Sequence, residues 1–138
     1  MSQLYEKNSL NKQEIDLTVP LVPDTVRIVR LTVSGIASRM GFSIDEIEDI
    51  KVAVAEICNR IITQCESISE RCVIKFNVLD EQLKVSFEFE DKKPKGFELF
   101  NEDDIFGVSI VNSLVDEVDL YTGKGEGIVT LSISLKEK

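Results

Sequence analysis

The sequence predicts an α+β fold, a two-layer sandwich in which helices cover one face of a mixed, mainly antiparallel sheet. Residues 26–40 and 44–64 carry apolar side chains at helical three- and four-residue steps, whereas several shorter stretches alternate polar and apolar residues as strands do. A length of 138 residues suits one hydrophobic core. We therefore expect a flexible tail over residues 1–13 and a single domain over residues 14–138.

The first strand and the first helix are separated by two prolines. Residues 14–19 alternate polar and apolar side chains, which predicts a strand with one buried face. Pro20 and Pro23 follow, and the Asp24-Thr25 pair can then cap a helix. This helix is expected to end at Gly41, because glycine readily adopts the left-handed conformation of a C′ position. Its apolar positions are Val29, Leu31, Val33, Ile36, Ala37 and Met40.

The second helix begins with a capping box. Ser43 and Glu46 have the S-x-x-E spacing in which each side chain bonds the backbone N–H of the other residue. Acidic residues in the first turn also suit the positive end of the helix dipole. We expect the helix to run to near Gln64, with apolar positions at Ile47, Ile50, Val54, Ile57, Cys58, Ile61 and Cys65.

Beyond residue 67 the apolar period changes to two, which is typical of strands. The charged stretch 91–106, which contains Gly96, is longer than an ordinary connection and is typical of a lid or a binding loop. The predicted element order is β-α-α-β-β-α-β-β. The later elements are expected as strands at 72–78 and 83–89 joined at 80–82, a helix at 105–114, and strands at 118–122 and 128–135 joined across 123–127.

Composition and charge exclude several classes of protein. Sixteen basic and 25 acidic residues give a net charge of −9, which argues against a nucleic-acid binder. The absence of His excludes His-based zinc sites and His-activated nucleophiles. We find no apolar run long enough to cross a bilayer and no signal peptide. Cys58, Cys65 and Cys72 form no CxxC pair, which favours reduced, buried thiols in the cytosol.

Polar side chains gather around Glu56 on the second helix. Asn59, Arg60 and Thr63 follow it at three-, four- and seven-residue steps, which share a helix face. A carboxylate that faces a cleft can orient or deprotonate a hydroxyl group. The alternative is a surface Glu56–Arg60 ion pair, a common i,i+4 arrangement worth only ~0.3–0.5 kcal/mol. Spacing alone favours the ion pair.

Asp91 and Gly107 lie at the two ends of the charged loop. Asp91 follows a strand, where its carboxylate can accept a hydrogen bond from the amino group of a ligand; an ordinary turn Asp is the alternative. Gly107 begins a helix, where a glycine lets phosphate oxygens approach backbone N–H groups; a simple helix-start glycine is the alternative.

Arg27, Arg30 and Arg39 interrupt the apolar pattern of the first helix. Arg30 lies between Val29 and Leu31, which predicts a mixed apolar and cationic face for a partner, because a planar guanidinium pairs bidentately with carboxylates. A solvated helix face is the alternative.

Two long segments carry a resemblance to a known family. Residues 29–41 (VRLTVSGIASRMG) and 45–56 (DEIEDIKVAVAE) resemble the RsbW-type anti-sigma factors, which are small bacterial serine kinases of the GHKL ATPase superfamily. The likeness covers nearly the whole chain, and residues 113–118 (SLVDEV) share it. It implies a Bergerat-type sandwich that binds ATP–Mg²⁺ between the long helix and a lid.

The resemblance also implies a function and its partners. Such proteins sequester an alternative sigma factor, which keeps it from RNA polymerase, and they phosphorylate a serine on an anti-anti-sigma protein of the STAS type. A cytoplasmic homodimer without direct contact with nucleic acid or membrane is therefore expected.

Individual residues match family positions. Glu56 matches the catalytic glutamate that activates the substrate hydroxyl, and Asp91 matches the aspartate that recognises the adenine amino group. Gly107 matches the second glycine of the motif after the lid, and Arg30 matches an arginine used in partner contact. The expected cofactor-binding set is completed by Asn59, Arg60 and Gly96, with Asn59 as the candidate metal ligand.

The chain also departs from the family pattern. The magnesium-holding Asn of the family lies four residues after the glutamate, where this chain has Arg60, and an Arg offers no acceptor to a metal ion. Arg60 can instead bind the phosphates directly, or pair with Glu56 and silence it. Asn59 lies one residue before position 60 and is therefore rotated about 100° from it around the helix. Further departures are Lys93 for a Gly of the adenine loop, Ile105 for the first Gly of the post-lid motif and Ile128 for a Thr.

Two functional hypotheses remain open. The first is an anti-sigma serine kinase with an unusual nucleotide site, which Glu56 and Asp91 favour. The second is a kinase-fold protein that has lost phosphotransfer and acts only by sequestering a partner, which the departures favour. Both share the antagonism of a sigma factor, and the density of matches over residues 29–56 argues against an unrelated interaction domain.

Overall fold

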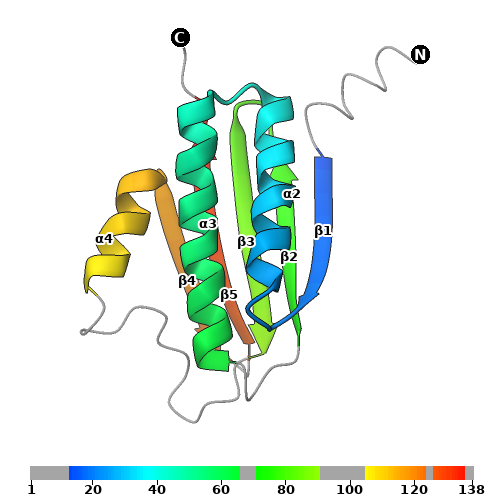
Figure 1. The fold of residues 1–138 in the computed structure, drawn as a ribbon, viewed down its shortest axis with the longest axis vertical. Helices are drawn as coiled ribbons and strands as arrows, with labels where there is room; N and C mark the ends of the chain where they lie inside the picture. Colours follow the sequence, from blue (N-terminus) through cyan, green and yellow to red (C-terminus); the bar gives the residue numbers. More distant parts are fainter. Residues whose placement is uncertain (1–12, 66–70, 91–104, 124–125, 136–138) are drawn as a thin grey trace.

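The computed structural model describes residues 13–65, 71–90, 105–123 and 126–135. Its helices and strands follow the predicted order. They are β1 (Gln13–Pro20), α2 (Thr25–Met40), α3 (Ile44–Cys65), β2 (Arg71–Val78), β3 (Gln82–Glu90), α4 (Ile105–Leu114), β4 (Glu117–Gly123) and β5 (Glu126–Ser134). Figure 1 shows α2 and α3 side by side in front of the sheet, with α4 on the other flank of α3. The two-layer α+β architecture is confirmed.

The sheet has the strand order β1-β2-β3-β5-β4, so the last strand of the chain lies inside the sheet and β4 at its edge. All four ladders that the structure describes are antiparallel. Across the central strands, Ile74 pairs with Phe87 and Phe87 with Val129, and all three side chains are buried. Because alternate residues of a strand share one face, this row lies on the face that the helices cover.

The two long helices bury the stripes that their spacing predicts. Val29 and Val33 of α2 and Ile50 and Ile57 of α3 are almost completely buried in one core. The assignment of Leu31 to the apolar face of α2 is wrong, because its side chain is 66% exposed. A residue two positions from Val29 and Val33 lies on the opposite side of a helix with 3.6 residues per turn.

The caps fix where each helix begins and ends. The Ser43 N–H donates to Glu46 Oε1 at 2.8 Å and the Glu46 N–H donates to Ser43 Oγ at 3.1 Å, so the predicted capping box of α3 is confirmed. Gly41 ends α2 with a φ of 98°, the left-handed conformation that glycine favours.

The expected Asp24-Thr25 cap of α2 is not formed by the Asp24 side chain. Asp24 has helical backbone angles, φ −63° and ψ −22°, and makes no side-chain cap hydrogen bond. An N-cap side chain usually reaches the first turn from an extended backbone conformation. The Thr25 hydroxyl instead donates to the Pro20 carbonyl oxygen at 2.7 Å, which ties the start of α2 to the end of β1. No helix of the described residues is long and apolar enough to cross a membrane.

Candidate functional site

Glu56 and Arg60 form an ion pair one turn apart on α3. Arg60 Nη2 donates to Glu56 Oε1 at 2.6 Å. The side chain of Glu56 is 32% exposed and that of Arg60 is 13% exposed, so the pair is partly buried. The structure therefore contains the i,i+4 pair that spacing alone favoured. One oxygen of Glu56, the candidate catalytic carboxylate, is bonded to the Arg60 guanidinium.

The other polar residues around Glu56 are only partly brought together. Asn59 and Thr63 are exposed, whereas Arg60 is mostly buried. Positions three and four residues after Glu56 lie on either side of it around the helix. The arrangement thus joins Glu56 with Arg60 and leaves Asn59, the candidate metal ligand, on the exposed surface of α3.

The remaining nucleotide-site candidates lie around α4 and the loop before it. Gly107 is the third residue of α4, within the first turn, and α4 packs beside α3 (Figure 1). Asp91 and Gly96 lie outside the described residues. The side of the expected site that would recognise adenine therefore remains a prediction.

Phe89 and Gly127 meet at the end of the sheet from which the chain leads to Asp91. They are paired across β3 and β5, and both are buried. A Cβ atom placed on Gly127 would lie 2.4 Å from two atoms of the Phe89 ring, closer than any side chain tolerates. A side chain at position 127 would therefore force the ring or the strand to shift, a relation between distant residues that sequence spacing did not reveal.

A hollow of about 70 Å³ lies between α3, α4 and the end of β5, away from Glu56. Three carboxylates line it, those of Glu46, Asp49 and Asp116. Cofactor pockets are usually several hundred Å³ in volume. Because this hollow is small and lined by carboxylates, it does not suit a nucleoside triphosphate.

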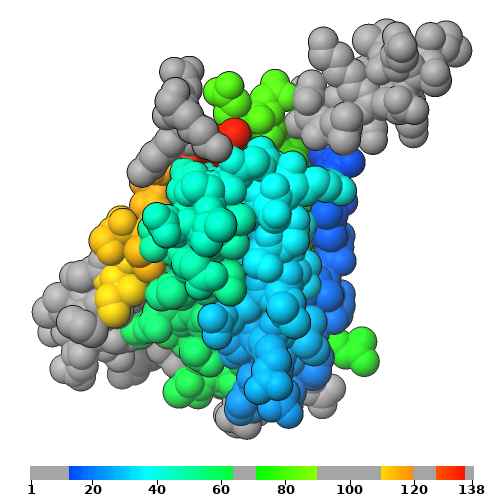
Figure 2. All heavy atoms as spheres, turned by 45° about the horizontal axis from the view of Figure 1, so that its top comes forward, coloured from blue at the N-terminus to red at the C-terminus, as the bar shows by residue number. Residues whose placement is uncertain are grey.

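The outer side of α2 carries exposed apolar and cationic side chains together. Arg27 and Arg30 are exposed, and Leu31 (66%) and Ile28 (51%) are exposed beside them. Figure 2 shows α2 and α3 side by side across this face of the molecule. We call the four residues Arg27, Ile28, Arg30 and Leu31 the α2 face; of these, sequence reasoning singled out Arg30 and missed Ile28.

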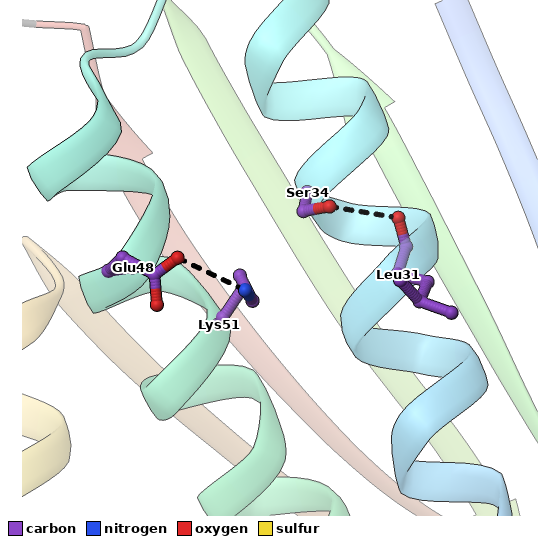
Figure 3. A network of polar contacts seen from close by, with 4 residues as sticks. All are labelled: Leu31, Ser34, Glu48 and Lys51. Carbon is purple, nitrogen blue, oxygen red and sulfur yellow. Dashed lines mark hydrogen bonds and ion pairs between the residues drawn. The ribbon is translucent and has the colours of Figure 1, made fainter.

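Polar contacts line the seam between the two helices. Lys51 of α3 lies on the side facing α2 and bonds Glu48 Oε1 at 3.1 Å, while the Ser34 hydroxyl of α2 donates to the Leu31 carbonyl oxygen at 3.2 Å (Figure 3). The Leu31 side chain in the same view points away from α3. The contacts of these polar side chains stay within each helix, so packing between the helices depends on their buried apolar stripes.

Two of the three cysteines, Cys58 and Cys72, lie in the hydrophobic core. Both are buried, as predicted, and neither forms a disulfide. Burial raises the pKa of the Cys58 thiol to about 11, because a buried thiolate would lose its hydration. Cys58 is therefore a neutral core residue at physiological pH, next to the site but not part of its chemistry.

The fold and the sequence match agree on the class of protein. Residues 19–133 match the family model of the histidine kinase-like ATPase domain. The structure resembles the RsbU and RsbW domains of a Mycobacterium tuberculosis protein, with a TM-score of 0.70 at 17% identity over 89% of this chain and 32% of the other. A histidine kinase domain from Erythrobacter litoralis gives a TM-score of 0.52 at 19% identity, over 85% of this chain and 62% of the other. These likenesses define a histidine kinase-like ATPase domain.

Curated relatives narrow the class. The serine-protein kinase RsbW of Bacillus subtilis is 40% identical over 60% of this chain and 58% of its own length. The RsbW proteins of Bacillus velezensis and Bacillus cereus are 31% and 28% identical, over 79% and 88% of their lengths and 80% and 91% of this chain. The chain belongs to the RsbW family of serine-protein kinases.

Proposed function

We propose that the protein is an anti-sigma factor that sequesters an alternative sigma factor and binds ATP to phosphorylate a serine on an anti-anti-sigma partner of the STAS type. Membership of the RsbW family supports this proposal. The observation that carries it is Glu56, a part-exposed carboxylate on α3, which by the sequence resemblance matches the family's catalytic glutamate. Asp91, Gly96 and Gly107 are proposed to complete the nucleotide site, with Asn59 as the candidate metal ligand.

The proposed chemistry assigns the proton to Glu56. The substrate serine oxygen forms a bond to the terminal phosphorus of ATP, the bond to the bridging oxygen breaks, and ADP leaves with the electron pair. The Glu56 carboxylate accepts the serine proton as general base. Arg60 binds Oε1 of that carboxylate, so proton transfer needs either Oε2 or a change of partner for Arg60.

The ion pair also favours a second candidate function. The Arg60 guanidinium occupies Oε1 of Glu56 at 2.6 Å, so in this structure that oxygen faces Arg60 and not a substrate hydroxyl. The protein would then act only by sequestering its partner, with a kinase fold but without phosphotransfer. Under either function we propose a cytoplasmic homodimer whose domain spans residues 14–138.

The test is phosphotransfer from labelled ATP to a purified anti-anti-sigma protein. We expect Glu56→Ala to abolish labelling of the substrate serine without unfolding the chain. Glu48→Ala is the matched control, since Glu48 is an exposed carboxylate on the same helix and pairs with the neighbouring Lys51. Undiminished transfer by Glu56→Ala would remove Glu56 from its catalytic role.

Titration of the wild type with an alternative sigma factor separates the two candidate functions. Sigma binding together with serine labelling supports the kinase. Sigma binding without any labelling, under conditions in which a Bacillus RsbW labels its own partner, supports sequestration alone. Absence of sigma binding contradicts both.

A further inference from the structure

The residues around Glu56 do not fit a magnesium ion. Mg²⁺ requires oxygen ligands in near-octahedral geometry, and position 60 offers a guanidinium that only donates hydrogen bonds. The Glu56 oxygen that would attract the ion is bonded to that guanidinium at 2.6 Å. Within residues 13–65, 71–90, 105–123 and 126–135, no group of three Cys, Asp or Glu side chains gathers to hold a metal.

We propose that Arg60 supplies the positive charge that a metal ion would supply, so that ATP binds this site without a divalent cation. This inference rests on the proposed nucleotide-binding function. Arg60 is a phosphate-binding residue in this account, and its partner changes from the Glu56 carboxylate to a phosphate oxygen when the nucleotide arrives.

Charge supports this exchange. The chain carries a net charge of −9, and Glu56 places one of its carboxylates at the site itself. A triphosphate that approaches this carboxylate without a cation would be repelled strongly, because the partly buried surroundings screen charges less than water does. Arg60, at only 13% exposure, places a permanent positive charge at this point.

The shape of the guanidinium supports it as well. Its planar fork matches the spacing of phosphate oxygens and forms bidentate, charge-assisted bonds. A phosphate group carries more negative charge than a carboxylate and offers more acceptor oxygens, so it can displace the Glu56 carboxylate from Arg60. The exchange frees Glu56 Oε1 only once a nucleotide is bound, which couples the proton acceptor to the presence of its substrate.

Calorimetric titration with ATP, in excess Mg²⁺ and in excess EDTA, tests the proposal. For the wild type we expect dissociation constants that agree within about threefold in the two conditions. Arg60→Asn should weaken binding in EDTA by about tenfold or more, since a charge-assisted bond to phosphate is lost, and Mg²⁺ should restore the affinity. Lys84→Asn, which removes a positive charge from the sheet face away from the helices, should leave both constants unchanged.

A conservative variant keeps the test decisive if Arg60→Asn fails to fold, which circular dichroism would reveal. Arg60→Lys retains the charge and should retain binding in EDTA, with the weaker affinity of a point charge that forms no fork.

Three results would overturn the proposal. Binding of ATP by the wild type only in Mg²⁺ would assign the charge to a metal ion and leave the proposed function intact. If the wild type binds ATP only in Mg²⁺ and Asn59→Ala no longer binds ATP in Mg²⁺, the ion would be assigned to Asn59. Binding in neither condition, by a folded wild type that still captures a sigma factor, would remove the nucleotide from the proposed function as well.

Discussion

Gly127 occupies a place in the sheet where the ring of Phe89 takes the room of a side chain. A Cβ atom there would lie 2.4 Å from the ring, so Gly127→Ala forces the ring or the strand to move. We expect a loss of about 1–3 kcal/mol in the free energy of unfolding, the usual effect of overpacking, measured by urea denaturation.

Gly35 provides the control for this substitution. It lies within α2, and a Cβ atom on it would meet nothing within 4 Å. Gly35→Ala should therefore stabilise the protein by about 0.5–1 kcal/mol, because alanine favours the helix more than glycine does. Equal losses in the two variants would contradict the account of Gly127.

The Cys58 thiol gives the stability of the protein a dependence on alkaline pH. Its pKa rises from 9.0 to about 11 on folding because the thiolate cannot be hydrated in the core. The folded state therefore holds the proton more tightly, and this contribution is fully present below pH 9 and lost as the pH rises through about 11.

Cys58→Ala should flatten this part of the pH profile. The packing loss lowers the free energy of unfolding at pH 7, but the difference from the wild type should shrink by up to about 2–3 kcal/mol between pH 8 and pH 11. Parallel urea titrations of both proteins across this range check it. A difference that stays constant with pH would show that the thiol titrates alike in the folded and unfolded chains.

At the scale of single elements, α3 shows how a local pattern defines a helix. The Ser43–Glu46 capping box satisfies two backbone N–H groups that would otherwise lack helical partners. Ser43→Ala should cost about 1 kcal/mol in the free energy of unfolding, measured by thermal or urea denaturation. Ser38→Ala, in the exposed last turns of α2, is the control and should change stability by less than about 0.5 kcal/mol.

The bounds of the elements could be predicted to within a residue or two because they depend on neighbours in the sequence. The first strand was expected at 14–19 and runs over Gln13–Pro20, and the third helix has its expected bounds, Ile105–Leu114. The contact that caps the start of α2 could not be predicted in this way. Asp24 and Thr25 both suit a cap, and only the position of the Pro20 carbonyl decides that the Thr25 hydroxyl bonds there.

At the scale of the whole molecule, the α2 face is the surface that we expect the sigma factor to contact. Arg30→Ala should weaken the complex by roughly 1–3 kcal/mol if Arg30 is an interface anchor, and Leu31→Ala should have an effect of similar direction. Lys84→Ala is the control, since Lys84 alternates with the buried Leu83 and Val85 and so lies on the sheet face away from the helices. Calorimetric titration with the sigma factor measures the dissociation constant of all three variants. An unchanged constant for Arg30→Ala would show that Arg30 lies on a solvated helix face and not in the interface.

The candidate site could be predicted from the sequence only in part. Glu56 and Arg60 share one helix, so their four-residue spacing already brings them within reach, and the structure pairs them at 2.6 Å. The same spacing argument grouped Asn59 with them, but its side chain is exposed. Which of several residues on one helix is covered depends on neighbouring elements, and spacing along that helix does not contain this information.

The sequence by itself determined the order and type of the elements, the capping box, the glycine that ends α2 and the family resemblance. Each of these depends on residues a few positions apart, where backbone propensity and side-chain hydrogen bonds act locally. Only the tertiary structure decided the strand order β1-β2-β3-β5-β4, the packing of Phe89 on Gly127 and the exposure of Leu31. These features arise from contacts between distant segments, and burial is decided when the helices meet the sheet.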